Sequence, residues 1–347
     1  MSLLARLAGA APVPIFPAIG RDGLARAERL FLSGDLQRAQ SPRQAAALVV
    51  VGALRAEDGP DLARLHDQLP HPRATLAWGD AAPIAPGGRA PETVAAGDDP
   101  TPALVALHRD LVAGRRASEP DLLPDEPPNP WRGRGDWGQG GEGMMGGTPY
   151  GRPMPMTDED LRDGLMLDAY TAPLGPFLPS LPPGLVLETT LQGDVIQSAA
   201  VRRPPHRQAE PAGPAAARLR IARLVRLMGL DAVAERLVRE ALAGRSGDAL
   251  ARRLARHGVL AAIPPGLGTL GGRDVRDRLA AWCAEAAGAP PAPGPEVVDA
   301  RLVDLLPGLE WHEATLVAAS FDPAALIRLC PRAPRDDDAL DEEETAA

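Results

Sequence analysis

Residues 40–83 read QSPRQAAALVVVGALRAEDGPDLARLHDQLPHPRATLAWGDAAP and contain two short apolar runs, at 46–51 and 74–78. Such runs are typical of parallel strands that are covered on both faces. Leucines at helical spacing lie between them, in residues 58–69, so the stretch predicts a strand–helix–strand unit. Each run ends at a glycine, and strand ends of this kind form the edge at which α/β proteins usually keep their chemistry. The second glycine is followed by Asp-Ala-Ala-Pro, which contains no reactive side chain.

The alternation of strand and helix extends outward from this stretch. The sequence VPIF at 13–16 predicts a first strand, followed by a helix at 22–32 and a possible edge strand at 36–40. A last helix is predicted at 102–113, with a proline near its first turn. Residues 1–115 therefore predict an α/β domain built on a doubly wound parallel sheet.

The next part of the chain changes in composition. Residues 116–156 are rich in glycine and proline and have no hydrophobic period, which predicts a long connector. Residues 157–205 predict a short helix at 158–167, with Thr157 as its N-cap, and then a β-hairpin with a tight Gln-Gly-Asp turn.

The remaining residues predict a small helical unit and a tail. In residues 206–290 we expect one long amphipathic helix at 215–243, with arginines on its polar side, and shorter helices at 248–257 and 274–287. For residues 291–347 we expect one or two weak helices followed by a solubilising acidic end.

Composition limits the functional classes. Hydrophobic residues make up 45% of the 347 residues and aromatic residues only 3%, so the core must be aliphatic. The net charge is −9, but seven negative charges lie in residues 336–344, and the nearly neutral remainder argues against nucleic-acid binding. All 37 basic residues are arginine, which with the abundant alanine, glycine and proline indicates a GC-rich genome. No window is apolar enough to span a membrane, which predicts a soluble protein or one docked on a membrane-spanning partner.

The two cysteines, Cys283 and Cys330, form no CxxC pair and cannot by themselves hold an iron–sulfur cluster or a closed zinc site. This cysteine usage favours a reducing cytoplasm. Cys283 lies in a predicted helix, where a buried thiol that acts as a small hydrophobe is the default expectation. The histidines are scattered without metal-ligand spacing, and no G-x-S-x-G motif supports a hydrolase.

The motifs in residues 41–80 resemble the small iron–sulfur subunit of NADH:quinone oxidoreductases (the 20 kDa type) and of NiFe hydrogenases. The shared features are Ser-Pro-Arg-Gln before a buried strand that ends in glycine, a helix that ends before a proline, and a second strand that ends in Gly-Asp. The resemblance implies a flavodoxin-like fold with a [4Fe-4S] cluster at the strand ends. Such a cluster needs thiolate ligands.

The sequence departs from the family pattern at each cluster ligand. The ligand after the second strand is Ala81 here, and a later Gly-Cys-Pro-Pro corresponds to a segment with Asp98 at the cysteine position. We therefore expect neither a cluster nor any catalytic residue. Asp80, Asp98 and Asp99 would be solvated carboxylates or, alternatively, ligands of a hard cation. Arg43, which in the family lies close to the cluster, would pair with Asp80 or contact a partner subunit.

Residues 170–197 resemble the start of the large, quinone-site subunit of the same complexes, where a Gly-Pro…His-Gly segment enters a β-hairpin. The resemblance places the family's quinone-facing histidines near Leu178 and Pro183, and neither residue donates a side-chain hydrogen bond. The chain thus resembles a fused, trimmed copy of two neighbouring subunits without the redox groups of either.

Residues 138–143 fit G-x-G-x-x-G but neither follow a predicted strand nor open a predicted helix, so a flexible or partner-ordered loop is the simpler interpretation. We expect this loop, together with the hairpin at 184–201 and the helix at 215–243, to face a partner.

The resulting hypothesis is a cluster-free accessory or structural subunit of a membrane-bound oxidoreductase of the NADH:quinone oxidoreductase or group 4 hydrogenase type. Its partners would be the other subunits, and its location the cytoplasm or the inner face of the plasma membrane. The alternatives are an active electron-transfer subunit with unidentified cluster or quinone ligands, and a free-standing interaction protein.

Overall fold

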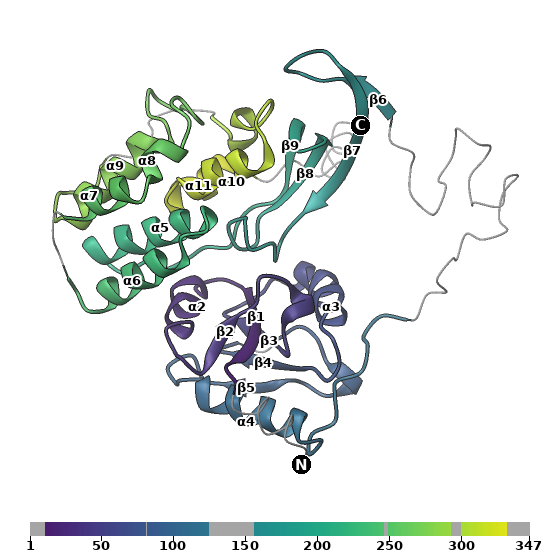
Figure 1. Cartoon of the computed structure of the whole chain (residues 1–347). Helices are drawn as coiled ribbons and strands as arrows, with labels where there is room; N and C mark the ends of the chain where they lie inside the picture. Colours follow the sequence, from purple (N-terminus) through teal and green to yellow (C-terminus); the bar gives the residue numbers. More distant parts are fainter. Residues whose placement is uncertain (1–10, 81, 125–155, 246–248, 293–299, 332–347) are drawn as a thin grey trace, which may run out of the picture.

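The computed structural model describes residues 11–80, 82–124, 156–245, 249–292 and 300–331. Its N-terminal part is an α/β domain with an all-parallel five-stranded sheet in the order β2-β1-β3-β4-β5, the flavodoxin-like order (Figure 1). The strands are β1 (Val13–Ile19), β2 (Leu36–Arg38), β3 (Ala47–Val51), β4 (Ala74–Trp78) and β5 (Glu92–Val94). The expected fold class is confirmed.

Both faces of the parallel sheet are covered because successive side chains of each strand point to opposite sides. On one face, β1 and β3 residues such as Ile15 and Val49 pack with α2 (Leu24–Leu30) and α4 (Thr101–Val112). On the other, Phe16 and Leu48 pack with α3 (Gly59–Asp67). All five residues of β3 and of β4 are buried, as their sequences predict. Three short 3-10 turns, η1 (Pro42–Gln44), η2 (Ala56–Asp58) and η3 (Pro86–Gly88), lie in the connections.

The second part begins with an antiparallel sheet in the order β6-β7-β8-β9. Its strands are β6 (Met156–Glu159), β7 (Met166–Leu174), β8 (Val186–Gln192) and β9 (Val195–Arg203). The hairpin β8–β9 is confirmed, but the predicted helix at 158–167 is wrong. Asp160 fixes a turn instead of a helix, because its side chain accepts a hydrogen bond from the backbone N–H of Arg162 at 2.7 Å and Gly164 adopts a φ of 70°.

The long helix expected at 215–243 is two helices, α5 (Pro214–Leu227) and α6 (Asp231–Leu242). The chain turns at Gly229, whose φ of 75° is the left-handed conformation that ends helices. Arg218, expected on the polar side, is buried. The helices α7 (Ala249–Arg256) and α9 (Val275–Ala286) lie where they were predicted, with a short α8 (Val259–Ala262) between them.

The C-terminal helices belong to the core of this second part. After η5 (Leu302–Leu305), α10 (Trp311–Ala319) and α11 (Pro323–Leu329) contribute Val317 and Leu326 to one hydrophobic cluster that also holds residues of β8, β9, α5 and α9. One or two weak helices were expected after residue 290; the two helices are present, but they pack in the core. The acidic tail lies outside the described residues.

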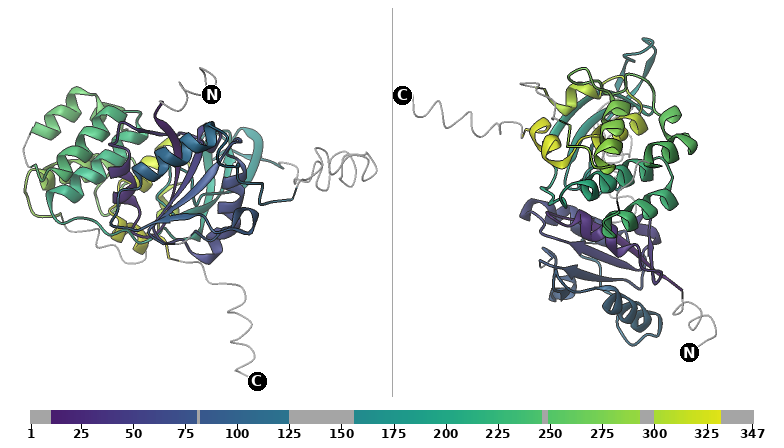
Figure 2. Two further views of the ribbon diagram at one scale, coloured as in Figure 1. Left: turned by 90° about the horizontal axis from the view of Figure 1, so that it is seen from below. Right: turned by 90° about the vertical axis from the view of Figure 1, so that its left-hand side faces the viewer.

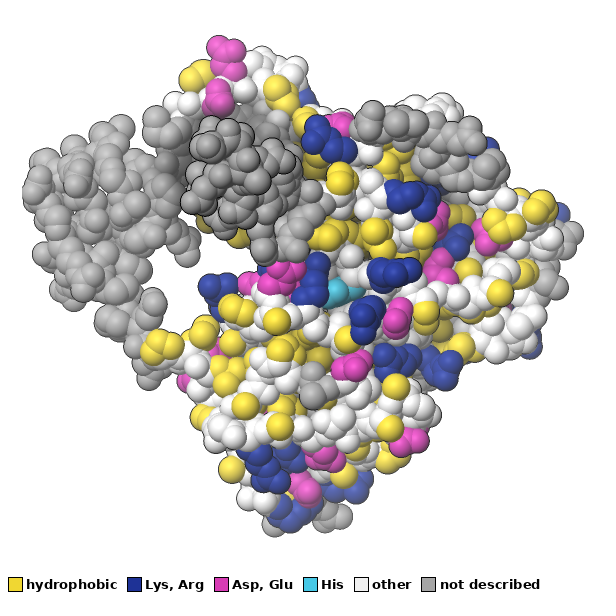
Figure 3. All heavy atoms as spheres, turned by 180° about the vertical axis from the view of Figure 1, so that it is seen from behind, with side chains coloured by type: hydrophobic (Ala, Val, Ile, Leu, Met, Phe, Trp, Pro, Cys, Tyr) yellow, Lys and Arg dark blue, Asp and Glu magenta, His cyan; other side chains and the backbone are white. Residues whose placement is uncertain are grey.

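The two parts sit against each other along one boundary, with the parallel sheet on one side and the hairpin and helices on the other (Figure 2). Arginine and carboxylate side chains mix along this boundary on the face shown in Figure 3. Among the described residues, no helix is both long and apolar enough to cross a bilayer.

Candidate functional site at the sheet edge

The carboxyl ends of β1, β3 and β4 meet at one edge of the parallel sheet. The strand order reverses between β1 and β3, and this switch point is where open α/β sheets normally bind ligands. The loops after the two strands are joined to each other, because the N–H of Arg21 donates to the carbonyl of Ala53 at 2.7 Å. The approach is so close that a Cβ on Gly20 would lie 2.6 Å from the carbonyl carbon of Ala53. Glycine is therefore required here for packing of the loops.

A segment of the second part, residues 203–209, lies across this switch point and will be called the plug segment. The Nε2 of Gln208 donates to the carbonyl of Gly20 at 3.0 Å, and its Oε1 accepts the N–H of Leu24 at 3.0 Å. Asp22 donates its N–H to the carbonyl of Arg207 at 3.0 Å, and its Oδ1 accepts the N–H of Ala209 at 2.7 Å. The plug segment thus takes up the polar groups at the start of α2, which a bound ligand would otherwise use.

A buried carboxylate anchors the plug segment beside the switch point. Asp58, at the end of η2, is fully buried and lies 2.8 Å from Nη1 of Arg203, 3.1 Å from Nε2 of His206 and 3.2 Å from Nε of Arg55. Burial alone would raise the pKa of Asp58, but the contacts with His206 and Arg55 outweigh it and hold the pKa below its ordinary value. The carboxylate is therefore ionised and paired.

Arg55 extends the same anchor across the boundary. Its Nη1 donates to the carbonyl of Pro204 at 2.8 Å, and its Nη2 donates to the carbonyl of Gly184 at 2.6 Å. Arg203 also contacts Asp61 of α3 through Nη2. These bonds tie η2 and α3 of the first part to the end of β9 and to the loop before β8 in the second part.

The structure does not bring the sequence-predicted residues into one site. Arg43 and Asp80 are exposed, and the ion pairs of the described residues do not include one between them. Asp98 is exposed and contributes its backbone carbonyl, which accepts the indole N–H of Trp78 at 3.0 Å. Ala81 lies outside the described residues.

The positions of these aspartates do not support the hypothesis of a hard-cation site. Asp99 accepts the N–H of Thr101 at 2.9 Å and so caps the start of α4. Across the described ranges, no group of three or more histidines, cysteines, aspartates or glutamates is placed to hold a metal ion.

Arg26 of α2, which the sequence analysis missed, lies at the end of β4. Its Nη1 donates to the carbonyl of Trp78 at 3.3 Å, and its guanidinium lies 5.6 Å from the centre of the indole ring. A Cβ on Gly79 would be 2.7 Å from the same nitrogen. The space beside Gly79 is therefore taken by a guanidinium, a cation with no capacity to ligate iron.

The donor set at the sheet edge does not fit a [4Fe-4S] cluster, because such a cluster is held by thiolates. Both cysteines lie in the hydrophobic core of the second part, Cys283 in α9 and Cys330 at the end of α11. Burial raises the pKa of Cys283 to about 11 and that of Cys330 to about 12, so both remain protonated thiols.

A cavity of about 440 Å³ lies beside the plug segment, between the two parts of the chain. It is lined by β1, α2 and the end of β2 on one side, and by the loop before β8, α5 and the α10–α11 connection on the other. Leu178 and Pro183, the positions that the resemblance assigned to quinone-facing histidines, both line it. The structure thus brings these two sequence-predicted positions into one wall.

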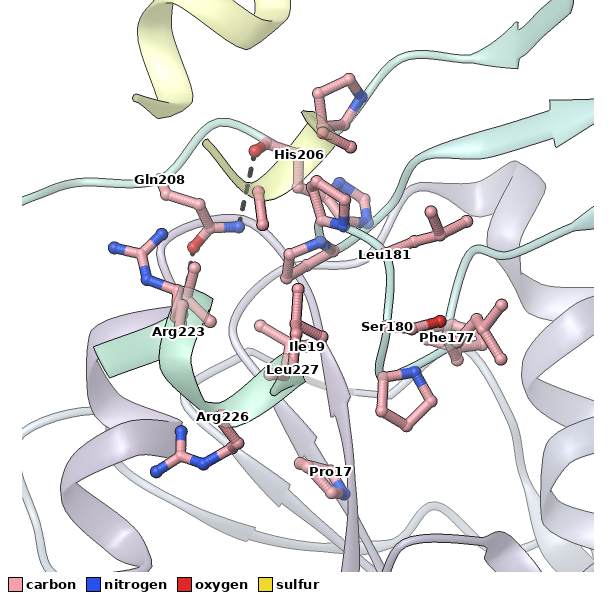
Figure 4. A pocket seen from close by; sticks show the side chains of 18 of the residues that line it. Pro17, Ile19, Phe177, Ser180, Leu181, His206, Gln208, Arg223, Arg226 and Leu227 are labelled. Atoms are coloured by element: carbon pink, nitrogen blue, oxygen red, sulfur yellow. Dashed lines mark hydrogen bonds between the residues drawn. The ribbon is translucent and has the colours of Figure 1, made fainter. Parts of the chain in front are cut away.

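Charged side chains gather on one side of the cavity, where Figure 4 shows Arg223 and Arg226 opposite Ser180 and Phe177. Glu28 of α2, only 3% exposed, accepts from Nη2 of Arg38 at 3.3 Å and from Nη1 of Arg226. Burial would raise the pKa of Glu28, but the charges of Arg38 and Arg226 outweigh it and hold the pKa below its ordinary value.

The residues that build this region were mostly missed at the sequence level. Their contacts join positions far apart in the chain, and no local period reveals them. The one local signal is the polar stretch RRPPHRQ at 202–208, directly after the hairpin. No protein-family model matches the sequence, and no curated protein matches it.

Proposed function

We propose that this protein is a structural or assembly subunit of a membrane-bound oxidoreductase of the NADH:quinone oxidoreductase or group 4 hydrogenase type, without an iron–sulfur cluster of its own. The observation that carries the proposal is the plug segment. The place where a flavodoxin-like sheet would present a ligand is filled by the chain itself, through Gln208, Arg207 and Ala209. A switch point that the chain itself covers is more consistent with a structural role than with electron transfer.

The side chains at the strand ends support the same interpretation. Arg26 lies beside Gly79, and the loops after β1 and β3 are bonded to each other and to the plug segment. None of the three loops contains a thiol in residues 20–23, 52–55 or 79–80. An active electron-transfer role would require ligands from another chain to enter a region that this chain already fills.

The surface suited to a neighbouring subunit is the arm formed by β6, its turn and β7, residues 156–174, which projects beyond the rest of the sheet (Figure 1). Of the seven large hydrophobic side chains that are exposed among the described residues, five lie on this arm: Leu161, Leu165, Met166, Leu167 and Tyr170. A concentration of exposed apolar area marks an interaction site. This differs from the expectation that the helix at 215–243 faces a partner, because α5 and α6 contribute to the core.

The proposal is tested by affinity purification of the tagged full chain from detergent-solubilised native membranes. We expect co-purification of integral-membrane redox subunits with the wild-type chain, and their loss from the double variant L165D/M166D. The double variant L123D/L242D carries the same substitutions at exposed hydrophobic positions outside the arm and serves as the matched control.

Two outcomes would contradict the proposal. Recovery of no membrane-bound redox subunit by the wild-type chain would favour a free-standing protein. Stoichiometric iron and acid-labile sulfide in the anaerobically purified chain would show an active cluster-bearing subunit.

A further inference from the structure

The cavity beside the plug segment has an unusual wall. Seven of its lining residues are prolines, which have no backbone N–H to offer a ligand. Leucine, isoleucine, phenylalanine and alanine side chains make up most of the remainder. These seven residues offer no backbone donor, and the side-chain donors of the wall belong to its few polar residues.

Three of those polar side chains are arginines. Arg38, Arg223 and Arg226 line the cavity, and Glu28 is the one carboxylate among its described lining residues. Each guanidinium has five N–H groups in a planar fork, which suits it to bind carboxylate or phosphate oxygens. Among the side chains that line the cavity, arginines therefore outnumber carboxylates three to one.

The three arginines retain unused donors. Arg226 donates from Nη1 to Glu28, and its Nε lies 3.5 Å from a carboxylate oxygen of Asp231. Arg223 donates from Nε to the carbonyl of Leu219 and from Nη2 to Glu210. Within the described residues, no hydrogen bond is formed by Nη2 of Arg226, by Nη1 of Arg223, or by Nη1 and Nε of Arg38. These groups are available to a ligand without any existing bond being broken.

The two sides of the cavity thus differ in chemistry. Arg223 and Arg226 lie on one side, and Phe177 lies on the other beside the small side chain of Ser180 (Figure 4). A volume of about 440 Å³ is within the range that accommodates small organic ligands. An apolar compartment next to a cluster of guanidinium groups is complementary to a molecule with an apolar chain and an anionic head.

We propose that this cavity binds a small anionic amphiphile, of the class of a medium-chain carboxylate, with its head against Arg223 and Arg226 and its chain along the proline-rich wall. The inference rests on the cavity alone and does not depend on the proposed function. The carbonyl oxygens of a neutral quinone can accept hydrogen bonds from the unused guanidinium donors but carry no full charge, so a quinone would gain less from them than a carboxylate.

The test is isothermal titration calorimetry of the full chain with four defined probes: decanoate, decanol, decyltrimethylammonium and butyrate. We expect decanoate to bind at least about tenfold more tightly than decanol, because a hydrogen bond to a charged group typically contributes that much or more. Butyrate, which keeps the charge but loses most of the apolar chain, should bind more weakly than decanoate. Equal binding of decanoate and decanol, preference for the cation, or no binding of decanoate would overturn the proposal.

Substitutions of the lining residues test whether the probes bind in this cavity. Arg223→Gln should weaken decanoate about tenfold or more and leave decanol unchanged, whereas Arg239→Gln, on the exposed face of α6, should leave both unchanged. Ser180→Phe should weaken the binding of decanoate and of decanol because it fills the apolar side, and the described residues form no hydrogen bond with the Ser180 side chain. If Arg223→Gln is not folded by circular dichroism, the comparison of decanoate with decanol and the Ser180→Phe variant still decide the question. Unchanged decanoate binding in a folded Ser180→Phe variant would place the ligand elsewhere.

Discussion

Replacing Asp58 with alanine should destabilise the protein strongly, because this carboxylate joins the two parts of the chain. Asp58 is fully buried and pairs with Arg55, Arg203 and His206 at distances from 2.8 to 3.2 Å. Removing one member of a buried ion pair leaves its partners uncompensated and typically costs about 3–5 kcal/mol. Arg203 keeps its contact with Asp61, which places the expected loss in the unfolding free energy at the lower end, about 3 kcal/mol.

The assay is urea unfolding followed by tryptophan fluorescence and circular dichroism. Trp78 reports on the parallel sheet, and Trp282 reports on the second part. The matched control is Asp110→Ala, which removes an exposed ion pair with Arg115 and should cost only about 0.2–1 kcal/mol. If Asp58→Ala lost no more stability than Asp110→Ala, the claim that Asp58 anchors the boundary would be refuted.

Three further predictions concern the boundary and the core of the second part. Gly184→Ala should lower the unfolding free energy by about 3 kcal/mol or more, because the φ of Gly184 is 82° and the new Cβ would lie 2.6 Å from Cγ of His206. The control Gly193→Ala, at a φ of 60° with open space around it, should lower it by only about 1 kcal/mol. Chemical denaturation of the two variants against wild type measures both, and equal costs would contradict the close packing. Because the pKa of Asp58 is lowered in the folded protein, its stabilising contribution is complete above the ordinary carboxylate pKa and is lost as the pH falls through the lowered value. The unfolding free energy of the wild type should therefore fall more steeply than that of Asp58→Asn below about pH 4. Parallel curves for the two proteins would contradict this. The two buried cysteines should react with a thiol reagent at pH 8 only on unfolding, since a pKa of about 11 or 12 leaves roughly one thiolate in a thousand or fewer; rapid labelling of the native chain would contradict their placement.

The sequence was most informative where burial alone determines structure. The runs at 47–51 and 74–78 are hydrophobic because both faces of β3 and β4 are covered, so strand type and the parallel sheet could be predicted. The prediction of a helix at 158–167 was wrong because Asp160 and Gly164 favour a turn, which lets β6 pair with β7. The prediction of a single helix at 215–243 was wrong because Gly229, in the left-handed conformation, divides it into two helices.

The candidate site was less predictable, because it is assembled across the boundary between the two parts. Gln208 reaches Gly20, and Arg226 reaches Glu28, over separations that no local pattern encodes. The absence of thiols from the strand-end loops could be read directly from the sequence. What fills that edge instead, the plug segment, required the structure.

The most direct test of the central claim, that the chain fills its own switch point, is native-state hydrogen exchange at the amides of Asp22 and Ala209. Both N–H groups are bonded across the boundary, to the carbonyl of Arg207 and to the carboxylate of Asp22. Both should exchange much more slowly than amides of surface loops that form no hydrogen bond, because freeing them requires the plug segment to leave. Exchange as fast as that of exposed surface loops would show that the switch point is open and contradict the account.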